Sequence, residues 1–180
     1  MSIQAGSHRL GPGDGTLAVR TGRTGAAAAA GHNLLIEVTA WEATLRNEDP
    51  AAVSVELHAD ATSLRVREGN GGVQPLDDDG RTSIQATIDD RVLKRQDITF
   101  HSTRVQTAGD GRRMTVQGEL SLVGQTHPIT FDLALTDGGR LTGSAVVKQT
   151  DWGIKPYSAM LGALKVADDV EVTIDAGLDR

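Results

Sequence analysis

The chain has 180 residues, a formal net charge of −6 and no cysteine. This length suits a single domain, and the lack of thiols excludes disulfide bonds and thiolate metal sites. Nucleic-acid binding requires a basic surface, which this acidic composition does not provide. No apolar run approaches the ~20 residues of a membrane-spanning helix. The composition therefore predicts a globular domain without a nucleic-acid partner and without a membrane span.

The N-terminal residues, 1–14, are predicted to form a flexible leader that runs into the glycine-rich turn Gly11-Pro-Gly-Asp-Gly15. They lack a basic region followed by an apolar stretch, so they do not have the pattern of a signal peptide. On this basis we expect a cytoplasmic protein whose folded domain covers residues 15–178.

The following segments alternate apolar and polar residues, which predicts strands with one apolar face. Leu17 and Val19 indicate a short first strand, and residues 32–45 have the pattern of one long strand. The apolar positions change parity before Trp41, and a β-bulge would explain the change because it inserts one extra residue. The intervening Ala26-Ala-Ala-Ala-Ala30 is too short for an independent helix. It is predicted as a loop or a tightly packed strand, with an opening into an interior space as the alternative.

One segment breaks the strand pattern. Thr82 followed by Gln85 matches a capping box, which marks the start of a helix. We therefore predict one amphipathic helix over residues 82–94, and a second short helix or ordered loop over residues 156–164. The apolar positions of the first helix recur at four-residue spacing: Ile84, Ile88 and Val92.

The clearest strand pattern lies in the centre of the chain, at residues 98–105, 114–122 and 129–135. Turns are predicted at Ala108-Gly-Asp-Gly111 and at Gly124-Gln-Thr-His-Pro128, and Asp-Gly is typical of a tight hairpin. These segments form an antiparallel meander with one apolar face. Further alternating segments extend the same sheet: residues 53–59, 141–147 and 170–174.

Four strings of this sequence resemble a known family. Ile98-Thr-Phe-His-Ser-Thr103 and Val116-Gln-Gly-Glu-Leu-Ser-Leu-Val-Gly-Gln-Thr-His-Pro-Ile129 resemble the central signature of the YceI-like, polyisoprenoid-binding family. Asp151-Trp-Gly-Ile154 resembles an element near the end of that family's domain, and Val170-Glu-Val-Thr-Ile174 stands where the family has its last strand. The likeness covers roughly residues 17–176.

This resemblance implies an all-β fold, namely a single antiparallel, lipocalin-like β-barrel with one or two short helices. It implies a non-catalytic protein that binds or carries a hydrophobic or amphiphilic ligand, such as an isoprenoid, a quinone or a fatty-acyl lipid, in its lumen. For Trp152 packing is an equally weighted alternative to ligand contact. The residues expected to line the lumen are Ile98, Phe100, Met114, Val116, Leu120, Leu122, Ile129, Phe131, Leu133, Leu135 and Trp152. The cations considered for a headgroup at the mouth are Arg95, Arg104, Lys148 and Lys155.

Two other interpretations of the same pattern stay open. The apolar rows would also fill a dry core, as in a ligand-free structural or interaction module. An enzyme acting on a lipid-like substrate would instead need two polar side chains that converge inside the cavity. The sequence shows no catalytic pattern: its histidines lie in separate segments, and no Gly-X-Ser-X-Gly elbow surrounds Ser158. Asp77-Asp-Asp79 lacks the spacing of a calcium loop and is predicted as a solvated loop. We therefore expect no enzymatic activity, metal or cofactor, and a homodimer is compatible with the sequence.

Overall fold

The computed structural model describes residues 3–49 and 51–178. Its strands are β1 (Ser7–Leu10), β2 (Gly15–Thr24), β3 (His32–Val38), β4 (Trp41–Arg46), β5 (Ser54–Ala59), β6 (Leu64–Gly71), β7 (Ile98–Thr107), β8 (Arg113–Leu122), β9 (Gln125–Leu135), β10 (Arg140–Lys148), β11 (Ser158–Ala159) and β12 (Leu164–Gly177). The helical elements of the same residues are α1 (Asp78–Thr87), the π-helical turn η2 (Ile88–Val92) and the 3-10 turns η1 (Ala28–Ala30), η3 (Gln149–Trp152) and η4 (Met160–Gly162).

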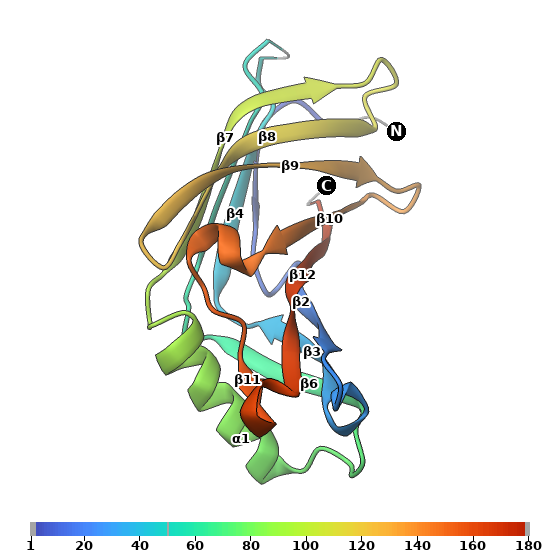
Figure 1. Ribbon diagram of the computed structural model, residues 1–180. Helices are drawn as coiled ribbons and strands as arrows, with labels where there is room; N and C mark the ends of the chain where they lie inside the picture. Colours follow the sequence, from blue (N-terminus) through green and yellow to red (C-terminus); the bar gives the residue numbers. More distant parts are fainter. Residues whose placement is uncertain (1–2, 50, 179–180) are drawn as a thin grey trace.

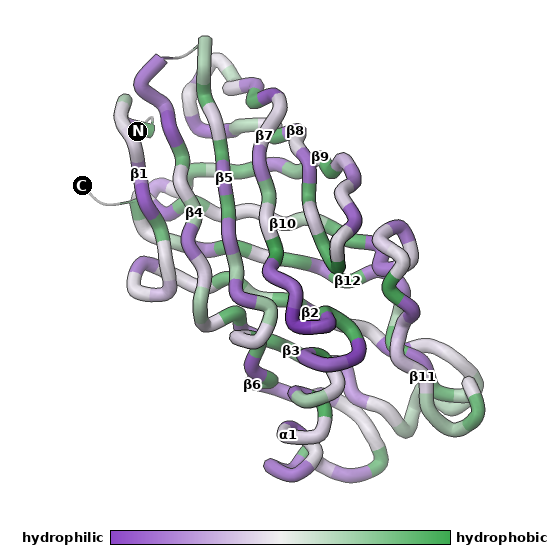
Figure 2. The backbone as a smooth tube through the Cα atoms, turned by 90° about the vertical axis from the view of Figure 1, so that its left-hand side faces the viewer, coloured by the Kyte–Doolittle hydropathy of each residue, from purple (hydrophilic) through white to green (hydrophobic). Residues whose placement is uncertain are grey.

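These strands form one antiparallel sheet in the order β1-β4-β5-β7-β8-β9-β10-β12-β2-β3-β6, with β11 paired to β12. The sheet curls into a half-barrel, and α1 lies at one end of it (Figure 1). Hydrophilic and hydrophobic residues alternate along the strands (Figure 2), because successive side chains of a strand point to opposite faces. The predicted all-β, lipocalin-like architecture is confirmed.

The central meander is β7, β8 and β9, as predicted, but its second turn lies earlier than expected. The chain reverses at Val123 and Gly124, whose φ angles of 50° and 75° are both left-handed. Two such residues form the type I′ turn that matches the twist of a hairpin. Gln125 and the residues that follow it, predicted to lie in the turn, are the first residues of β9.

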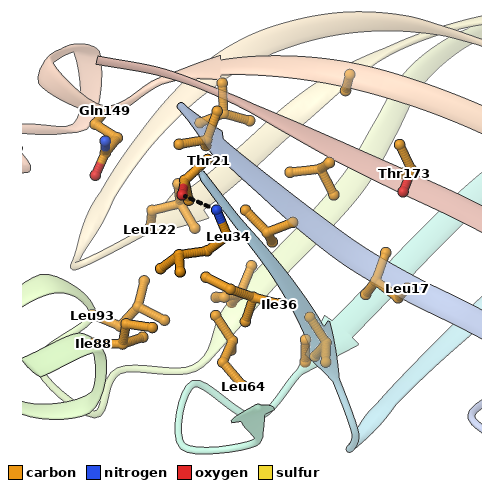
Figure 3. Close-up of a pocket in the computed structure, with 18 of the residues that line it drawn as sticks. Leu17, Thr21, Leu34, Ile36, Leu64, Ile88, Leu93, Leu122, Gln149 and Thr173 are labelled. Carbon is orange, nitrogen blue, oxygen red and sulfur yellow. Dashed lines mark hydrogen bonds between the residues drawn. The ribbon is translucent and has the colours of Figure 1, made fainter. Parts of the chain in front are cut away.

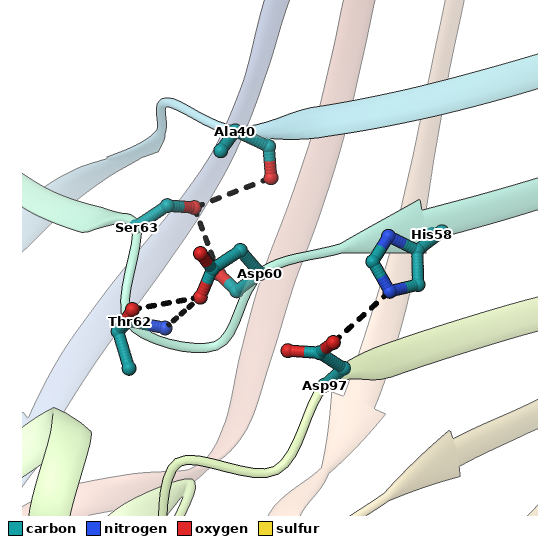
Figure 4. Close-up of polar contacts among 6 residues, drawn as sticks. All are labelled: Ala40, His58, Asp60, Thr62, Ser63 and Asp97. Carbon is teal, nitrogen blue, oxygen red and sulfur yellow. Dashed lines mark hydrogen bonds and ion pairs between the residues drawn. The ribbon is translucent and has the colours of Figure 1, made fainter.

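The predicted long strand over residues 32–45 is two strands, β3 and β4, on either side of a corner at Thr39 and Ala40. β4 pairs with β5 and β3 pairs with β6, so one long hairpin bends as a whole. Ser63 is buried at this corner, and its hydroxyl lies 3.3 Å from the carbonyl oxygen of Ala40 and 2.7 Å from that of Asp60 (Figure 4). The change in apolar parity therefore marks a corner in both strands rather than a single-residue bulge in one.

Asp60 fixes the turn at this corner through Thr62. Its Oδ1 accepts hydrogen bonds from the backbone N–H and from the hydroxyl of Thr62, both at 2.7 Å (Figure 4). The side-chain hydrogen bond from Thr62 is the main reason why the pKa of Asp60 lies below its ordinary value of 3.8. A carboxylate that accepts hydrogen bonds in the folded state holds its proton less tightly there than in the unfolded chain.

This lowered pKa predicts a pH dependence of stability. Because the folded pKa lies below the unfolded one, the contribution of Asp60 is complete above about pH 5 and is lost as the pH falls through the folded pKa. We expect wild type to be more stable than Asp60→Asn at pH 7, with a difference that shrinks at pH 3. Urea unfolding at both pH values measures this difference, and an equal difference at both would contradict the assignment.

The helix begins earlier than predicted. Its N-cap is Asp77, whose Oδ1 accepts a hydrogen bond from the N–H of Gly80 at 2.8 Å, and Asp78 and Asp79 occupy the first turn. The predicted start at Thr82 and the solvated loop at residues 77–79 are therefore wrong. Asp77 satisfies a free N–H group of the first turn, and the carboxylates of Asp78 and Asp79 interact favourably with the positive end of the helix dipole. Together they outweigh the capping box.

Three further segments differ from the expectation. Within the expected leader at residues 1–14, the structure places β1, which pairs with β4, and Leu10 is buried; residues 1 and 2 lie outside the described residues. β2 covers ten residues and is much longer than the expected short strand. In the segment 156–164 the structure has β11 followed by the 3-10 turn η4.

Candidate ligand-binding site

A cavity of about 490 Å³ lies between the curled sheet and α1. Binding sites for small molecules typically have roughly 300–1,000 Å³ and a mostly apolar wall. Inward-facing side chains of the strands and of the segment α1–η2 form this wall, and Figure 3 shows part of it. Those labelled in the figure include Leu17, Leu34, Ile36, Leu64, Ile88, Leu93 and Leu122.

The cavity is not filled by protein side chains. Val19, Leu34, Leu57 and Val172 all line it, and each is only half-buried although it points away from the outer surface. An apolar side chain with this environment still has surface that another apolar group can cover. The space therefore suits an apolar guest.

Many of the residues predicted to line the lumen border this cavity. Two of them, Phe100 of β7 and Phe131 of β9, pack ring against ring with centroids 5.3 Å apart and planes tilted by 59°. Such tilted aromatic pairs give the wall a fixed shape. The predicted residues that line the cavity are Ile98, Phe100, Leu120, Leu122, Ile129, Phe131 and Leu133.

The remaining predicted residues lie elsewhere. Met114, Val116 and Leu135 are buried at the end of the barrel far from α1 and do not line the cavity. Trp152 is also buried, and its indole Nε1–H donates a hydrogen bond to the carbonyl oxygen of Leu120 at 2.9 Å. His127 lies edge-on to the same indole at 5.5 Å. Trp152 thus packs on the barrel wall, and the far end of the barrel is filled.

The sequence prediction missed the wall formed by β2 and β3. Leu17 and Val19 from β2 and Leu34 and Ile36 from β3 line the cavity together with residues of α1. The alternation of apolar residues in these segments predicts strands, but no local signal shows that their apolar face lines the lumen. Arg23 shares the parity of Leu17 and Val19 and also lines the cavity, so parity was the signal that could have identified it.

The mouth of the cavity lies at the α1 end. Ser83, Tyr157 and Lys165 line the cavity and are also exposed to solvent, which locates the opening between α1 and the segment around β11. Two polar side chains beside it are engaged with backbone. The guanidinium of Arg23 donates to the carbonyl oxygen of Gly31, and Nε2 of His32 lies 2.8 Å from the carbonyl oxygen of Gln74.

The cations considered from the sequence do not line the cavity. Arg95 pairs with Asp90 at 2.8 Å, and Arg104 and Lys148 are exposed on the strands β7 and β10. Lys155 is exposed shortly before Tyr157. Lys165 and Arg23 are the cations of the lining, and sequence reasoning did not single out either of them.

The alanine run forms a loop at the mouth with a single 3-10 turn, η1. The N–H of Ala27 donates to the carbonyl oxygen of Ala163 at 2.9 Å, which ties the loop to the start of β12. Ala30 and Gly31 border the cavity. A β-carbon at Gly31 would lie 2.7 Å from Cδ1 of Leu164, so a larger residue here would require the Leu164 side chain to move.

Asp168 holds η3 against the barrel. Its Oδ1 and Oδ2 accept hydrogen bonds from the N–H and the hydroxyl of Thr150 at 2.9 and 2.6 Å, and the hydroxyl bond is the main reason why the pKa of Asp168 is lowered. Gln149, in the same turn, is buried in the cavity wall and donates from Nε2 to the carbonyl oxygen of Ala167 at 2.9 Å. The turn therefore presents one buried polar side chain to a mostly apolar space.

The described residues contain no group of three or more His, Asp or Glu side chains that could hold a metal ion. Two histidines contact carboxylates on the outer surface through Nε2, His58 with Asp97 at 3.1 Å and His101 with Glu119 at 3.0 Å. In the same part of the chain, no helix has the length and apolarity needed to cross a bilayer.

Comparison with known proteins agrees with this architecture. A family model described as YceI-like domain matches residues 19–178. No curated protein matches the chain significantly.

Solved structures share the fold at low sequence identity. BcnA of Burkholderia cenocepacia aligns with a TM-score of 0.59 and 15% identity over 88% of this chain and 94% of its own. A polyisoprenoid-binding domain from Saccharophagus degradans, implicated in plant cell wall breakdown, aligns with a TM-score of 0.57 and 11% identity over 96% and 97%. The YceI protein of Campylobacter jejuni aligns with a TM-score of 0.55 and 15% identity over 81% and 84%.

Proposed function

The chain belongs to the YceI-like family, and from this membership and its cavity we propose that it binds or carries one hydrophobic or amphiphilic chain molecule without catalysis. The observation that carries the proposal is the apolar cavity of about 490 Å³, open at the α1 end. A polyisoprenoid-binding domain with the same fold supports an isoprenoid-like ligand, with quinones and fatty-acyl lipids as related candidates.

The chemistry of the wall supports an apolar chain as the ligand. A bound hydrocarbon gains roughly 0.8 kcal/mol for each methylene group that leaves water. Inside the cavity, Thr44 and Gln149 are buried polar side chains, whereas Arg23 and Lys165 stand near the mouth. A ligand would therefore place its chain against the sheet and its polar head near the opening.

The hydrogen bonds made by polar side chains of the cavity wall support binding without catalysis. Thr21 Oγ1 accepts from the N–H of Leu34 at 3.3 Å, and Arg23 and His32 contact backbone carbonyl oxygens. Acid–base or nucleophilic catalysis needs two side chains within hydrogen-bond reach of one reacting centre. These three polar side chains of the wall each contact a backbone group rather than one another.

The second candidate is a ligand-free structural module, which the filled far end of the barrel favours. The side chains of Met114, Val116 and Leu135 are buried there and do not line the cavity. The two candidates differ only in whether the end near α1 is occupied by a ligand in solution.

Native mass spectrometry of gently purified protein decides between them, combined with lipid analysis of an organic extract of the same sample. We expect a stoichiometric adduct whose mass matches an extracted lipid. A mass that stays bare after incubation with isoprenoids, quinones and fatty acids would contradict ligand binding and favour the structural module.

A further inference from the structure

Most of the large apolar side chains that the described residues expose to solvent gather around the mouth of the cavity. Met160 and Leu161 form the tip of a hairpin made of β11, η4 and the start of β12, residues 158–166, which we call the mouth hairpin. Met160 is 60% exposed and Leu161 is fully exposed, and Tyr157 precedes them in the chain. Val73, also exposed, stands next to Gln74, whose carbonyl oxygen contacts His32 of the cavity wall.

The tip is held in this position by its base. Ser158 pairs with Lys165 and Ala159 with Leu164, and the carbonyl oxygen of Ala163 accepts the hydrogen bond from Ala27. Met160 and Leu161 have φ angles of 52° and 55°, in the left-handed region that side-chain-bearing residues rarely adopt. The strained backbone turns both side chains toward solvent, and an apolar surface displayed in this way is typical of a contact site.

The shape and charge of this tip favour a lipid bilayer over a second copy of the chain. A stable protein interface buries about 800 Å² on each partner, whereas the exposed apolar surface of this tip comes from two side chains, Met160 and Leu161. Exposed lysines, Lys155 and Lys165, stand beside it, and Arg91 lies 6.0 Å from the centre of the Tyr157 ring. Tyrosine and lysine are typical of the boundary between headgroups and acyl chains, because each combines an apolar stem with a polar end.

We propose that the mouth hairpin docks on the surface of a lipid bilayer, with Met160 and Leu161 inserted among the headgroups. Tyr157 and Lys165 belong both to the docking surface and to the lining of the cavity. Docking therefore places the mouth against the membrane, and a lipid-like ligand passes between bilayer and cavity without crossing bulk water. The exchange step rests on the proposed function, whereas the docking step needs no ligand. The net charge of −6 makes apolar insertion, rather than attraction of the whole protein, the driving force.

Co-sedimentation with phosphatidylcholine vesicles, with and without phosphatidylglycerol, tests the docking step. The informative variant is Met160→Asn/Leu161→Asn, because asparagine tolerates a left-handed backbone and removes the apolar surface. We expect the affinity of the protein for both kinds of vesicle to fall at least about tenfold in this variant. Val146→Asn is the matched control, since Val146 is exposed on β10 and lies outside the mouth. Its vesicle binding should equal that of wild type, and the thermal unfolding of both variants checks their fold.

Transfer of a pyrene-labelled fatty acid from vesicles to the protein tests the exchange step. In wild type the transfer rate should rise with vesicle concentration. In the double asparagine variant the transfer rate should not rise, although wild type and variant should bind the free probe with equal affinity. Wild type that does not sediment with either kind of vesicle overturns the docking proposal. A wild-type dimer in size-exclusion chromatography that becomes a monomer in the double variant also overturns the docking proposal. That result would assign the tip to self-association. Vesicle docking without any probe binding in solution would leave docking standing and contradict the proposed function.

Discussion

Ala145→Phe is expected to weaken the binding of an apolar chain about 100-fold and to leave the fold intact. Ala145 lines the cavity from β10, opposite Val172 of β12. A phenyl ring at this position takes the place of about four methylene groups of the ligand, which corresponds to about 3 kcal/mol and about 100-fold in Kd. The ring enters open space, so we expect an unchanged or raised Tm. Titration with the lipid recovered from the protein, or with a fluorescent fatty acid, measures the change in Kd.

The neighbouring residue provides the matched control for this substitution. Val146 lies on the opposite face of the same strand and is 65% exposed. Val146→Phe adds a similar ring outside the barrel and should bind the ligand as wild type does. An equal loss in both variants would show that the ring disturbs β10 itself. Undiminished binding by Ala145→Phe would place the ligand outside the cavity.

Leu135→Ala is expected to lower the free energy of unfolding by about 2–5 kcal/mol, the usual cost of removing a buried leucine side chain. Leu135 is buried in the filled end of the barrel. Leu34→Ala removes the same atoms from a side chain that borders the cavity and is only half-buried, so its cost should be about half as large. Urea unfolding of the ligand-free protein, followed by circular dichroism, measures both values.

This pair also separates stability from binding. Leu34→Ala should weaken the affinity for an apolar ligand. In Leu135→Ala, the fraction of protein that remains folded should bind the ligand with the affinity of wild type. Equal losses of stability in the two variants would indicate that the end near α1 packs as tightly in solution as the far end. That result would favour the ligand-free module.

The central meander could be predicted from the sequence because its information is local. Strict alternation sets the faces of β7, β8 and β9, and short turns bring these strands together. Alternation does not give the depth of a residue along the barrel axis. Met114 and Val116 share one row of β8 with Leu120 and Leu122, yet only the latter two border the cavity. The side chains that face them come from distant parts of the chain, and no local pattern identifies these partners.

The same limit explains the wall that was missed. β2 forms the cavity because it pairs with β12, at the other end of the chain, and with β3. Its parity placed Leu17, Val19 and Arg23 on one face, but the sequence does not say that this face is interior. The prediction of the helix start failed for another reason, because two local signals competed. Thr82 offered a capping box, and Asp77 capped the helix in the structure.

The bent hairpin of β3–β4 and β5–β6 has a consequence for the width of the barrel. One half of this hairpin, β4 and β5, lies near one end of the strand order. The other half, β3 and β6, forms the opposite end. In the described part of the chain no strand ladder joins β1 to β6, so covalent continuity through Thr39–Ala40 and residues 60–63 holds the two margins of the sheet together. Because hydrogen bonds fix this corner and no ladder closes the seam, the angle between the two halves of the bent hairpin sets the width of the barrel.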